Sequence, residues 1–307
     1  MVQSILEQAM EAGREEIPLG EVASYIPELG HADKNHLGIC ILTKDGEIYE
    51  AGDTMVRFTI QSISKVISLA AALQHCGFEK VFEKVGMEPS GDAFNSLLKL
   101  DMSSDYPCNP MINSGAIAVA SYLSPVVSFE EMLEYAKKLC MDPDIVLDEK
   151  IYHSEMTHSA RNRAIAYLLE SKGIIESDVE KSLELYVKMC SLSITARSLA
   201  GLGLVLANGG IHPKTGERLL DSNVVRAVKT IMLTCGMYDG SGEFAVHVGM
   251  PSKSGVGGGI LSVVDKKMGI GIYGPALDEK GNSIAGRYML KYLSDMLHLH
   301  IFADENQ

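Results

Sequence analysis

The sequence of 307 residues has no tryptophan, few aromatic residues and fewer basic than acidic side chains. Aromatic residues make up 6% of the chain, and 27 Lys and Arg against 40 Asp and Glu leave a formal net charge of −13. Proteins that bind nucleic acids contact the phosphate backbone through clustered Lys and Arg side chains. The sequence shows no basic stripe of that kind, so we expect no nucleic-acid partner.

Long hydrophobic runs are also missing. The longest apolar stretches, Val66–Leu73 and Gly115–Leu123, are much shorter than the ~20 residues of a membrane-spanning helix, so we expect no membrane partner. The N-terminal residues are typical of an amphipathic helix that carries Glu7 and Glu11, and they lack the basic start and apolar centre of a signal peptide. These features predict a cytoplasmic protein.

Motifs for disulfides, metals and dinucleotides are absent. The six cysteines lie tens of residues apart without a C-x-x-C pair, which favours reduced thiols, although their even number leaves a secreted protein as the lesser alternative. His153 and His158 are five residues apart and no H-E-x-x-H occurs. The run Gly255–Gly259 lacks the G-x-G-x-x-G pattern. We therefore expect neither a metal nor another cofactor.

The pattern of apolar residues predicts strands near both ends of the chain. Residues 36–50 alternate around Lys44-Asp45-Gly46, which indicates a hairpin with an Asp-Gly turn. The strand period returns in Phe244–Val248, Gly258–Val264 and Gly269–Tyr273. Helical spacing predicts further helices over Ser62–Gln74, Asn113–Leu123, Ser128–Cys140, Ala160–Glu170, Glu176–Met189, Thr195–Ala207, Ser222–Leu233 and Ile284–Leu297.

This order of elements predicts an α+β protein. Because strands occur before residue 60 and after residue 243 but hardly between, the N- and C-terminal segments are expected to share one antiparallel sheet around a large helical insert. We expect a discontinuous sheet domain of residues 1–60 plus 236–307 and a helical domain of residues 61–235. The active site is expected between them.

Ser62 and Lys65 form the first chemical signal. In an S-x-x-K motif at a helix start, the hydroxyl and the amine lie one turn apart on the same face. A serine hydroxyl becomes a good nucleophile when a neighbouring base takes its proton, and a lysine can act as that base when burial lowers its pKa. By spacing alone, however, a serine at a helix start is more often an N-cap.

Two further segments follow in an informative order. Asn113 stands at the start of a predicted helix, where its amide could hold a substrate or cap the helix. Lys253-Ser254-Gly255 matches the K-[ST]-G triplet that lines the active site of penicillin-recognising serine enzymes, although it could also be a polar turn. The order S-x-x-K, Asn, K-S-G is that of serine β-lactamases and transpeptidases.

With other motifs, these segments resemble the bacterial glutaminase family. The resemblance implies a β-lactamase/transpeptidase-like fold and the hydrolysis of L-glutamine to L-glutamate and ammonia without a metal. It also implies a small-molecule substrate and a homodimer or homotetramer. It extends from Tyr25–Leu29 to the last helix and is carried by Gly52-Asp53, Gln61–Lys65, Asn109–Ile117, Arg161–Arg163, Ala207–Gly210, Cys235–Asp239 with Ser241-Gly242, and Lys253–Gly259.

The resemblance also implies roles for individual residues. Ser62 becomes the nucleophile of an acyl-enzyme mechanism, with Lys65 and Tyr238 as its partners in proton transfer. The backbone N–H groups of Ser62 and Val256 become the oxyanion hole. The substrate-binding positions are Tyr25, Ser62, Asn113, Glu155, Asn162, Tyr186, Tyr238 and Val256, with Glu155 as the partner of the α-ammonium group.

Two other functions remain as alternatives. A β-lactam or cell-wall peptide hydrolase would share Ser62-x-x-Lys65 and the K-S-G triplet, but the sequence lacks the S-D-N triplet and a secretion signal. A non-catalytic ligand-binding relative would share the fold. The presence of Ser62, Lys65 and Tyr238 together argues against it.

Overall fold

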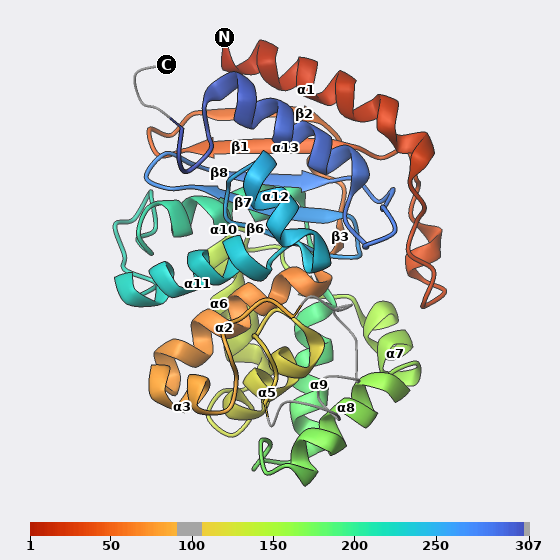
Figure 1. Cartoon of the computed structure of the whole chain (residues 1–307), viewed down its shortest axis with the longest axis vertical. Coiled ribbons are helices and arrows are strands. Elements are labelled where there is room, and N and C mark those ends of the chain that lie inside the picture. The colour runs from red at the N-terminus through yellow and green to blue at the C-terminus, as the bar shows by residue number, and fades with distance from the viewer. Residues whose placement is uncertain (91–105, 304–307) are drawn as a thin grey trace.

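The computed structural model describes residues 1–90 and 106–303, and one antiparallel sheet of five strands dominates one end of it (Figure 1). The strand order is β2-β1-β8-β7-β6. The strands are β1 (Gly38–Thr43), β2 (Ile48–Gly52), β6 (Ser252–Ser254), β7 (Gly259–Val264) and β8 (Met268–Tyr273).

The sheet is assembled from the two ends of the chain, as the sequence predicts. β1 and β2 form the expected hairpin, in which Gly46 adopts a φ of +90° in the turn. β1 then pairs with β8, from Gly38 opposite Tyr273 to Thr43 opposite Met268. The prediction of an α+β protein with a sheet shared by both terminal segments is therefore confirmed.

Helices cover both faces of this sheet. On one face lie α1 (Val2–Glu16) and α13 (Ile284–Leu297), which run side by side (Figure 1). On the other face lies α10 (Ala196–Ala207), which packs against β8. A Cβ atom at Gly271 of β8 would lie 1.9 Å from the carbonyl oxygen of Ala196, so glycine is what allows the helix to approach this closely.

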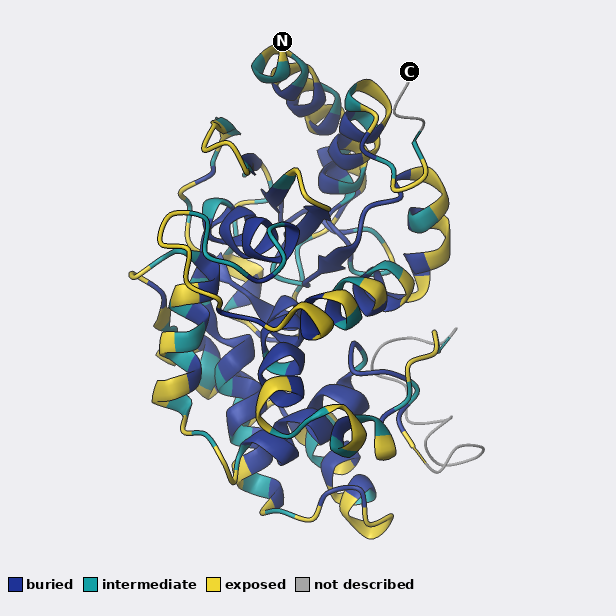
Figure 2. Ribbon diagram, turned by 90° about the vertical axis from the view of Figure 1, so that its left-hand side faces the viewer, coloured by how far each residue is buried: buried dark blue, intermediate teal, exposed yellow. Residues whose placement is uncertain are grey.

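The rest of the described chain is mainly helical. The helices α2 (Ser64–His75) and α5 (Asn113–Leu123) are mostly buried at its centre. Figure 2 shows buried ribbons in the middle of the molecule and exposed faces on the outer helices. A small sheet of order β3-β5-β4 contains β3 (Phe58–Thr59), β4 (Val146–Leu147) and β5 (Leu192–Ile194). The remaining α-helices are α2 (Ser64–His75), α3 (Phe78–Glu83), α5 (Asn113–Leu123), α6 (Phe129–Cys140), α7 (Glu149–Thr157), α8 (Ala160–Ser171), α9 (Val179–Cys190), α11 (Ser222–Cys235) and α12 (Ser241–His247).

One predicted strand is wrong. Phe244–Val248 was expected to be a strand, but most of this segment belongs to α12. Phe244 and Val248 are both buried while Val246 between them is 72% exposed. Apolar residues at positions i and i+4 share one side in a strand and in a helix, whereas a residue at i+2 shares that side only in a strand. The burial of Phe244 and Val248 with Val246 exposed therefore fits the helix.

The expected domain boundaries remain a prediction. Residues 61–235 were assigned to a helical domain, and α10, which lies within this range, packs on the sheet.

Within the described residues, none of the helices combines the length and the apolar character that crossing a membrane requires.

Candidate active site

Ser62 lies in a short 3-10 helix, Gln61–Ile63, that leads directly into α2. The serine is buried, with 7% of its surface exposed. Gln61 before it adopts the left-handed backbone, with a φ of +50°, which is uncommon for a residue with a side chain. Such a conformation is found mostly where the surrounding structure holds it in place, often at functional sites.

Lys65 lies in the first turn of α2 and is 2% exposed. Its Nζ atom donates hydrogen bonds to Oδ1 of Asn113 at 2.7 Å and to the carbonyl oxygen of Met111 at 3.3 Å. Both acceptors are neutral, so neither compensates a full positive charge. Burial lowers the pKa of Lys65 to about 8, so a useful fraction of the amine is neutral near physiological pH.

Tyr238 follows α11 in the 3-10 helix Tyr238–Gly240 and also has a left-handed backbone, with a φ of +55°. Burial raises the pKa of the Tyr238 phenol, whereas hydrogen bonding with the Ser62 side chain and the Val256 backbone lowers it. The phenol is therefore next to both the serine hydroxyl and the loop that carries Val256. This position suits a group that exchanges a proton at Ser62.

Lys253 is a second buried amine at this site, and it was not among the predicted site residues. It lies in the edge strand β6, donates to the Ser254 carbonyl oxygen at 2.6 Å, and places Nζ 4.4 Å from the ring centroid of Tyr238. Burial lowers the pKa of Lys253 well below its usual range, and the charge of Lys65 lowers it further. The K-S-G triplet was the sequence signal that could have identified it.

A second group of contacts surrounds Glu155 of α7. The carboxylate is buried and accepts a hydrogen bond from the Tyr25 hydroxyl, which also lies 3.0 Å from Oε1 of Gln61. Burial raises the pKa of Glu155, and hydrogen bonds from Tyr25 and Gln61 oppose this effect. Gln61, which the sequence analysis did not single out, stands directly before Ser62 and so connects Glu155 to the segment that carries the serine.

The other predicted residues join the same network. Asn113, at the start of α5, donates from Nδ2 to Oδ1 of Asn162 in α8 at 3.0 Å. Tyr186 of α9 is buried with its ring centroid 6.0 Å from Nζ of Lys65. The structure thus brings together all the residues that the resemblance assigned to the site. The roles of these residues remain predictions.

Metal-ligating side chains do not gather at this site. In the described parts of the chain, His, Cys, Asp and Glu side chains do not come together in threes or more where they could hold an ion. The acid–base groups described above are instead amines, phenols and one buried carboxylate.

Comparisons with known proteins place the chain in a family. The model of the family named Glutaminase matches residues 20–302. The chain belongs to the glutaminase family. This glutaminase is 52% identical over 305 residues to the glutaminase of Fusobacterium nucleatum, and the match covers 98% of this chain and 100% of that protein. It is 50% identical over 305 residues to glutaminase 2 of Clostridium perfringens, with the same coverage.

A solved structure is also similar to this glutaminase. The Bacillus subtilis glutaminase YbgJ has been solved as a covalent complex with 5-oxo-L-norleucine, formed by reaction with 6-diazo-5-oxo-L-norleucine. It is 39% identical, has a TM-score of 0.88, and the match covers 98% of this glutaminase and 100% of that chain. The resemblance to bacterial glutaminases and the β-lactamase/transpeptidase-like fold, both expected from the sequence, are confirmed.

Proposed function

We propose that this glutaminase hydrolyses the side-chain amide of L-glutamine to L-glutamate and ammonia, with Ser62 as the nucleophile. The observation that carries the proposal is the buried pair Ser62 and Lys65, in which the amine faces neutral acceptors and Tyr238 contacts the serine. The names of the relatives and the reaction of the YbgJ protein with a glutamine-like electrophile support the choice of substrate.

The reaction begins with proton transfer from Ser62. The neutral Lys65 amine takes the hydroxyl proton as Oγ attacks the amide carbon, and the backbone N–H groups of Ser62 and Val256 stabilise the charge on the carbonyl oxygen. Tyr238 gives a proton to the leaving nitrogen, and the C–N bond breaks to release ammonia. In the second half of the reaction the proton transfers run in reverse. Water attacks the ester and gives a proton to the Tyr238 phenolate, and protonated Lys65 returns a proton to Oγ of Ser62, which frees glutamate and restores the serine.

Recognition of glutamine requires a partner for each charged end. Glu155 pairs with the α-ammonium group, because its present hydrogen-bond partners are neutral and leave its charge available. The amides of Asn113 and Asn162 bind the α-carboxylate, with Tyr25 and Tyr186 lining the pocket. Asn113 also accepts from Lys65, so binding of the carboxylate and placement of the base are linked.

The assay that tests this function is ammonia release from glutamine and from asparagine, alongside hydrolysis of nitrocefin. We expect turnover of glutamine, weaker turnover of asparagine because its amide lies one methylene short of Ser62, and no turnover of nitrocefin. Fit to one methylene contributes ~1–3 kcal/mol. Hydrolysis of nitrocefin without release of ammonia from glutamine would favour the β-lactam hydrolase instead.

The pH dependence of activity follows from Lys65. The amine must be neutral to accept the serine proton, and burial lowers its pKa to about 8. We therefore expect kcat/KM to rise as pH increases through about 8 and to level off above it, as the protonated fraction disappears. The measured midpoint belongs to the coupled cluster of amines and phenols rather than to Lys65 alone. A profile that is flat from about pH 6 to 9 would contradict a lysine base.

Glu155→Gln should chiefly weaken substrate binding. The variant loses a buried charge-assisted hydrogen bond, so we expect KM to rise and kcat/KM to fall. The fall corresponds to a loss of about 1.5–3 kcal/mol of transition-state stabilisation. It should also lose the preference for glutamine over an analogue that lacks the α-amino group. Glu149→Gln, on the exposed part of the same helix, is the matched control and should keep both properties.

The unchanged enzyme and Glu155→Gln are each measured with glutamine and with the analogue that lacks the α-amino group. These four values form a thermodynamic cycle that isolates the contact between Glu155 and the ammonium group. Equal losses for glutamine and the deaminated analogue would show that Glu155 has another role.

We further propose a cytoplasmic, homo-oligomeric enzyme. The six cysteines are all free, which suits a reducing compartment. Light scattering after size exclusion would measure the assembly, and a monomer at assay concentration would contradict the expected dimer or tetramer.

A further inference from the structure

The proposed reaction exchanges two small molecules at Ser62 while the glutamyl group stays attached. Ammonia leaves when the ester forms, and water enters before the ester is hydrolysed. During this time the glutamyl group occupies the pocket that glutamine used, with its α-ammonium group held by Glu155. A second route, which does not pass along the glutamyl group, would let ammonia leave and water enter.

The two ends of the proposed glutamine pocket differ in exposure. Tyr25, which donates to Glu155, is 53% exposed, so the α-end of glutamine lies near the surface. Ser62 and Lys65 are buried, so the amide lies at the inner end. Ammonia is therefore released, and water consumed, behind the glutamyl group rather than at the mouth of the pocket.

A cavity of about 140 Å³ reaches this inner end. Its lining includes Tyr238, whose phenol hydrogen bonds with Ser62. It also includes Met111, whose carbonyl oxygen accepts from Nζ of Lys65 at 3.3 Å. Each member of the proposed catalytic pair thus contacts a residue of the cavity wall. Of the residues assigned to glutamine, Tyr238 alone appears in the described lining, so this cavity is separate from the glutamine pocket.

The cavity runs from these buried residues to the surface. Tyr238 and Met111 form its inner end and are buried. Thr234, Asp239 and Gly242 form its outer end and are exposed. A Cβ atom added at Gly242 would meet open space. The cavity therefore opens to solvent near Gly242.

The size and the lining of this cavity suit water and ammonia rather than glutamine. One water needs roughly 10–15 Å³ of cavity volume, whereas pockets for organic ligands usually have about 300 Å³ or more. Asp239 is the only charged side chain in the described lining, so no like charge repels an ammonium ion there.

The wall of the cavity is held by its own hydrogen bonds. Asn109, which is buried in this wall, donates to the Glu88 carbonyl oxygen at 2.8 Å and accepts from the Met111 N–H at 2.9 Å. Because both ends of the amide are satisfied, it does not need to retain a passing water molecule.

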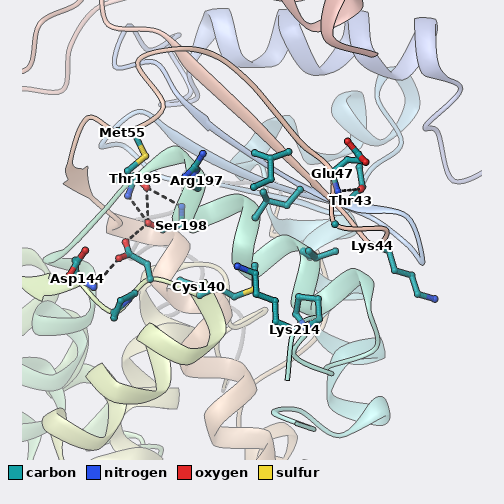
Figure 3. Close-up of a pocket in the computed structure, with 18 of the residues that line it drawn as sticks. Thr43, Lys44, Glu47, Met55, Cys140, Asp144, Thr195, Arg197, Ser198 and Lys214 are labelled. Atoms are coloured by element: carbon teal, nitrogen blue, oxygen red, sulfur yellow. Dashed lines mark hydrogen bonds between the residues drawn. The ribbon is translucent and has the colours of Figure 1, made fainter. Parts of the chain in front are cut away.

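The larger cavity drawn in Figure 3 offers no such route. It has a volume of about 430 Å³ and lies between the β1–β2 hairpin and α10. Its described lining includes none of Ser62, Lys65, Met111 and Tyr238. The small cavity beside Tyr238 is therefore the one that connects the serine with solvent.

We propose that the cavity beside Tyr238 is the path by which ammonia leaves and water reaches the glutamyl ester. Tyr238 gives its proton to the leaving nitrogen, so ammonia is released at the inner end of the cavity. Water arrives at the same place and gives a proton to the Tyr238 phenolate as its oxygen bonds to the ester carbon. The bond from that carbon to Oγ of Ser62 then breaks, and Lys65 returns the proton to Oγ. This inference rests on the proposed function, since it takes Ser62 as the nucleophile.

Gly242→Phe tests the path, because it places a bulky side chain at the outer end. We expect kcat for glutamine to fall about tenfold, since the passage of ammonia and water then limits turnover. The rate at which 6-diazo-5-oxo-L-norleucine labels the variant should stay unchanged, because that reaction needs neither ammonia release nor water. Thr234→Phe places the same ring at another exposed position of the lining and should act in the same way.

Val246→Phe is the matched control. It adds the same ring to α12 at a position that is 72% exposed and lies outside the cavity lining, so it should keep the kcat of the unchanged enzyme. Thermal unfolding confirms that each variant is folded, and Thr234→Phe decides the outcome if Gly242→Phe is not.

The proposal is overturned if the folded plug variants keep the kcat of Val246→Phe. It is also overturned if kcat and the labelling rate fall together, because the substitution then disturbs Ser62 rather than the path. Failure of the proposed function looks different, since the unchanged enzyme itself would release no ammonia from glutamine or would take no label on Ser62.

Discussion

Replacing Ser62 by alanine is expected to abolish glutamine hydrolysis. Removal of a serine nucleophile lowers kcat by about 10⁴-fold or more in enzymes with comparable machinery, because no other group forms the acyl intermediate. The change deletes one hydroxyl from a buried position and keeps the pocket, so glutamine should still bind. Ammonia release measures the first effect and calorimetric titration with glutamine measures the second.

Ser64→Ala is the matched control for this experiment. Ser64 is buried at the start of α2, two residues after Ser62, where its hydroxyl lies 3.5 Å from Sγ of Cys190. We expect the control to retain most of its turnover. Ser62→Ala activity above a few per cent of the unchanged enzyme, measured on fully folded protein, would mean that another group is the nucleophile.

Lys65→Ala is expected to have the second largest effect, a loss of about 10²- to 10⁴-fold in kcat. The amine is the base for Ser62, and its acceptors Asn113 and Met111 cannot replace it. Lys65→Arg should not restore turnover, since a guanidinium does not give up its proton in a protein. An added small primary amine such as ethylamine should restore part of the activity of Lys65→Ala.

Thermal unfolding of these variants controls for loss of structure, because Lys65 is fully buried in the helical core. Rescue that increases with pH would identify a neutral amine as the active species. Full activity in Lys65→Arg would show that Lys65 contributes only its positive charge.

Periodicity predicted the long elements well. α5 and α13 have the bounds that the sequence indicated, since their apolar residues recur over three or more turns. The short helix α7 was not predicted, because its sequence is mostly polar and its buried residues include Ser154 and Glu155. Its capping by Asp148, which accepts from the Ile151 N–H at 3.0 Å, is the local signal that was available.

The site itself could be predicted only through the resemblance. Tyr25 and Glu155 are 130 residues apart, and no local pattern indicates that their side chains meet. Gln61 and Tyr238 adopt left-handed backbone without being glycine, which tertiary contacts impose. The lowered pKa of Lys65 depends on burial by the surrounding helices, so the S-x-x-K spacing could suggest a base but could not establish one.

The most direct test of Ser62 as the nucleophile is to identify the residue that a glutamine-like electrophile labels. The enzyme is treated with 6-diazo-5-oxo-L-norleucine, digested, and mapped by tandem mass spectrometry, with Ser62→Ala treated in parallel. We expect one 5-oxo-L-norleucine group on Ser62, with loss of activity in proportion to labelling, and no label in the variant. A label on Cys190, Cys235 or any residue other than Ser62, with the variant labelled equally, would contradict this expectation.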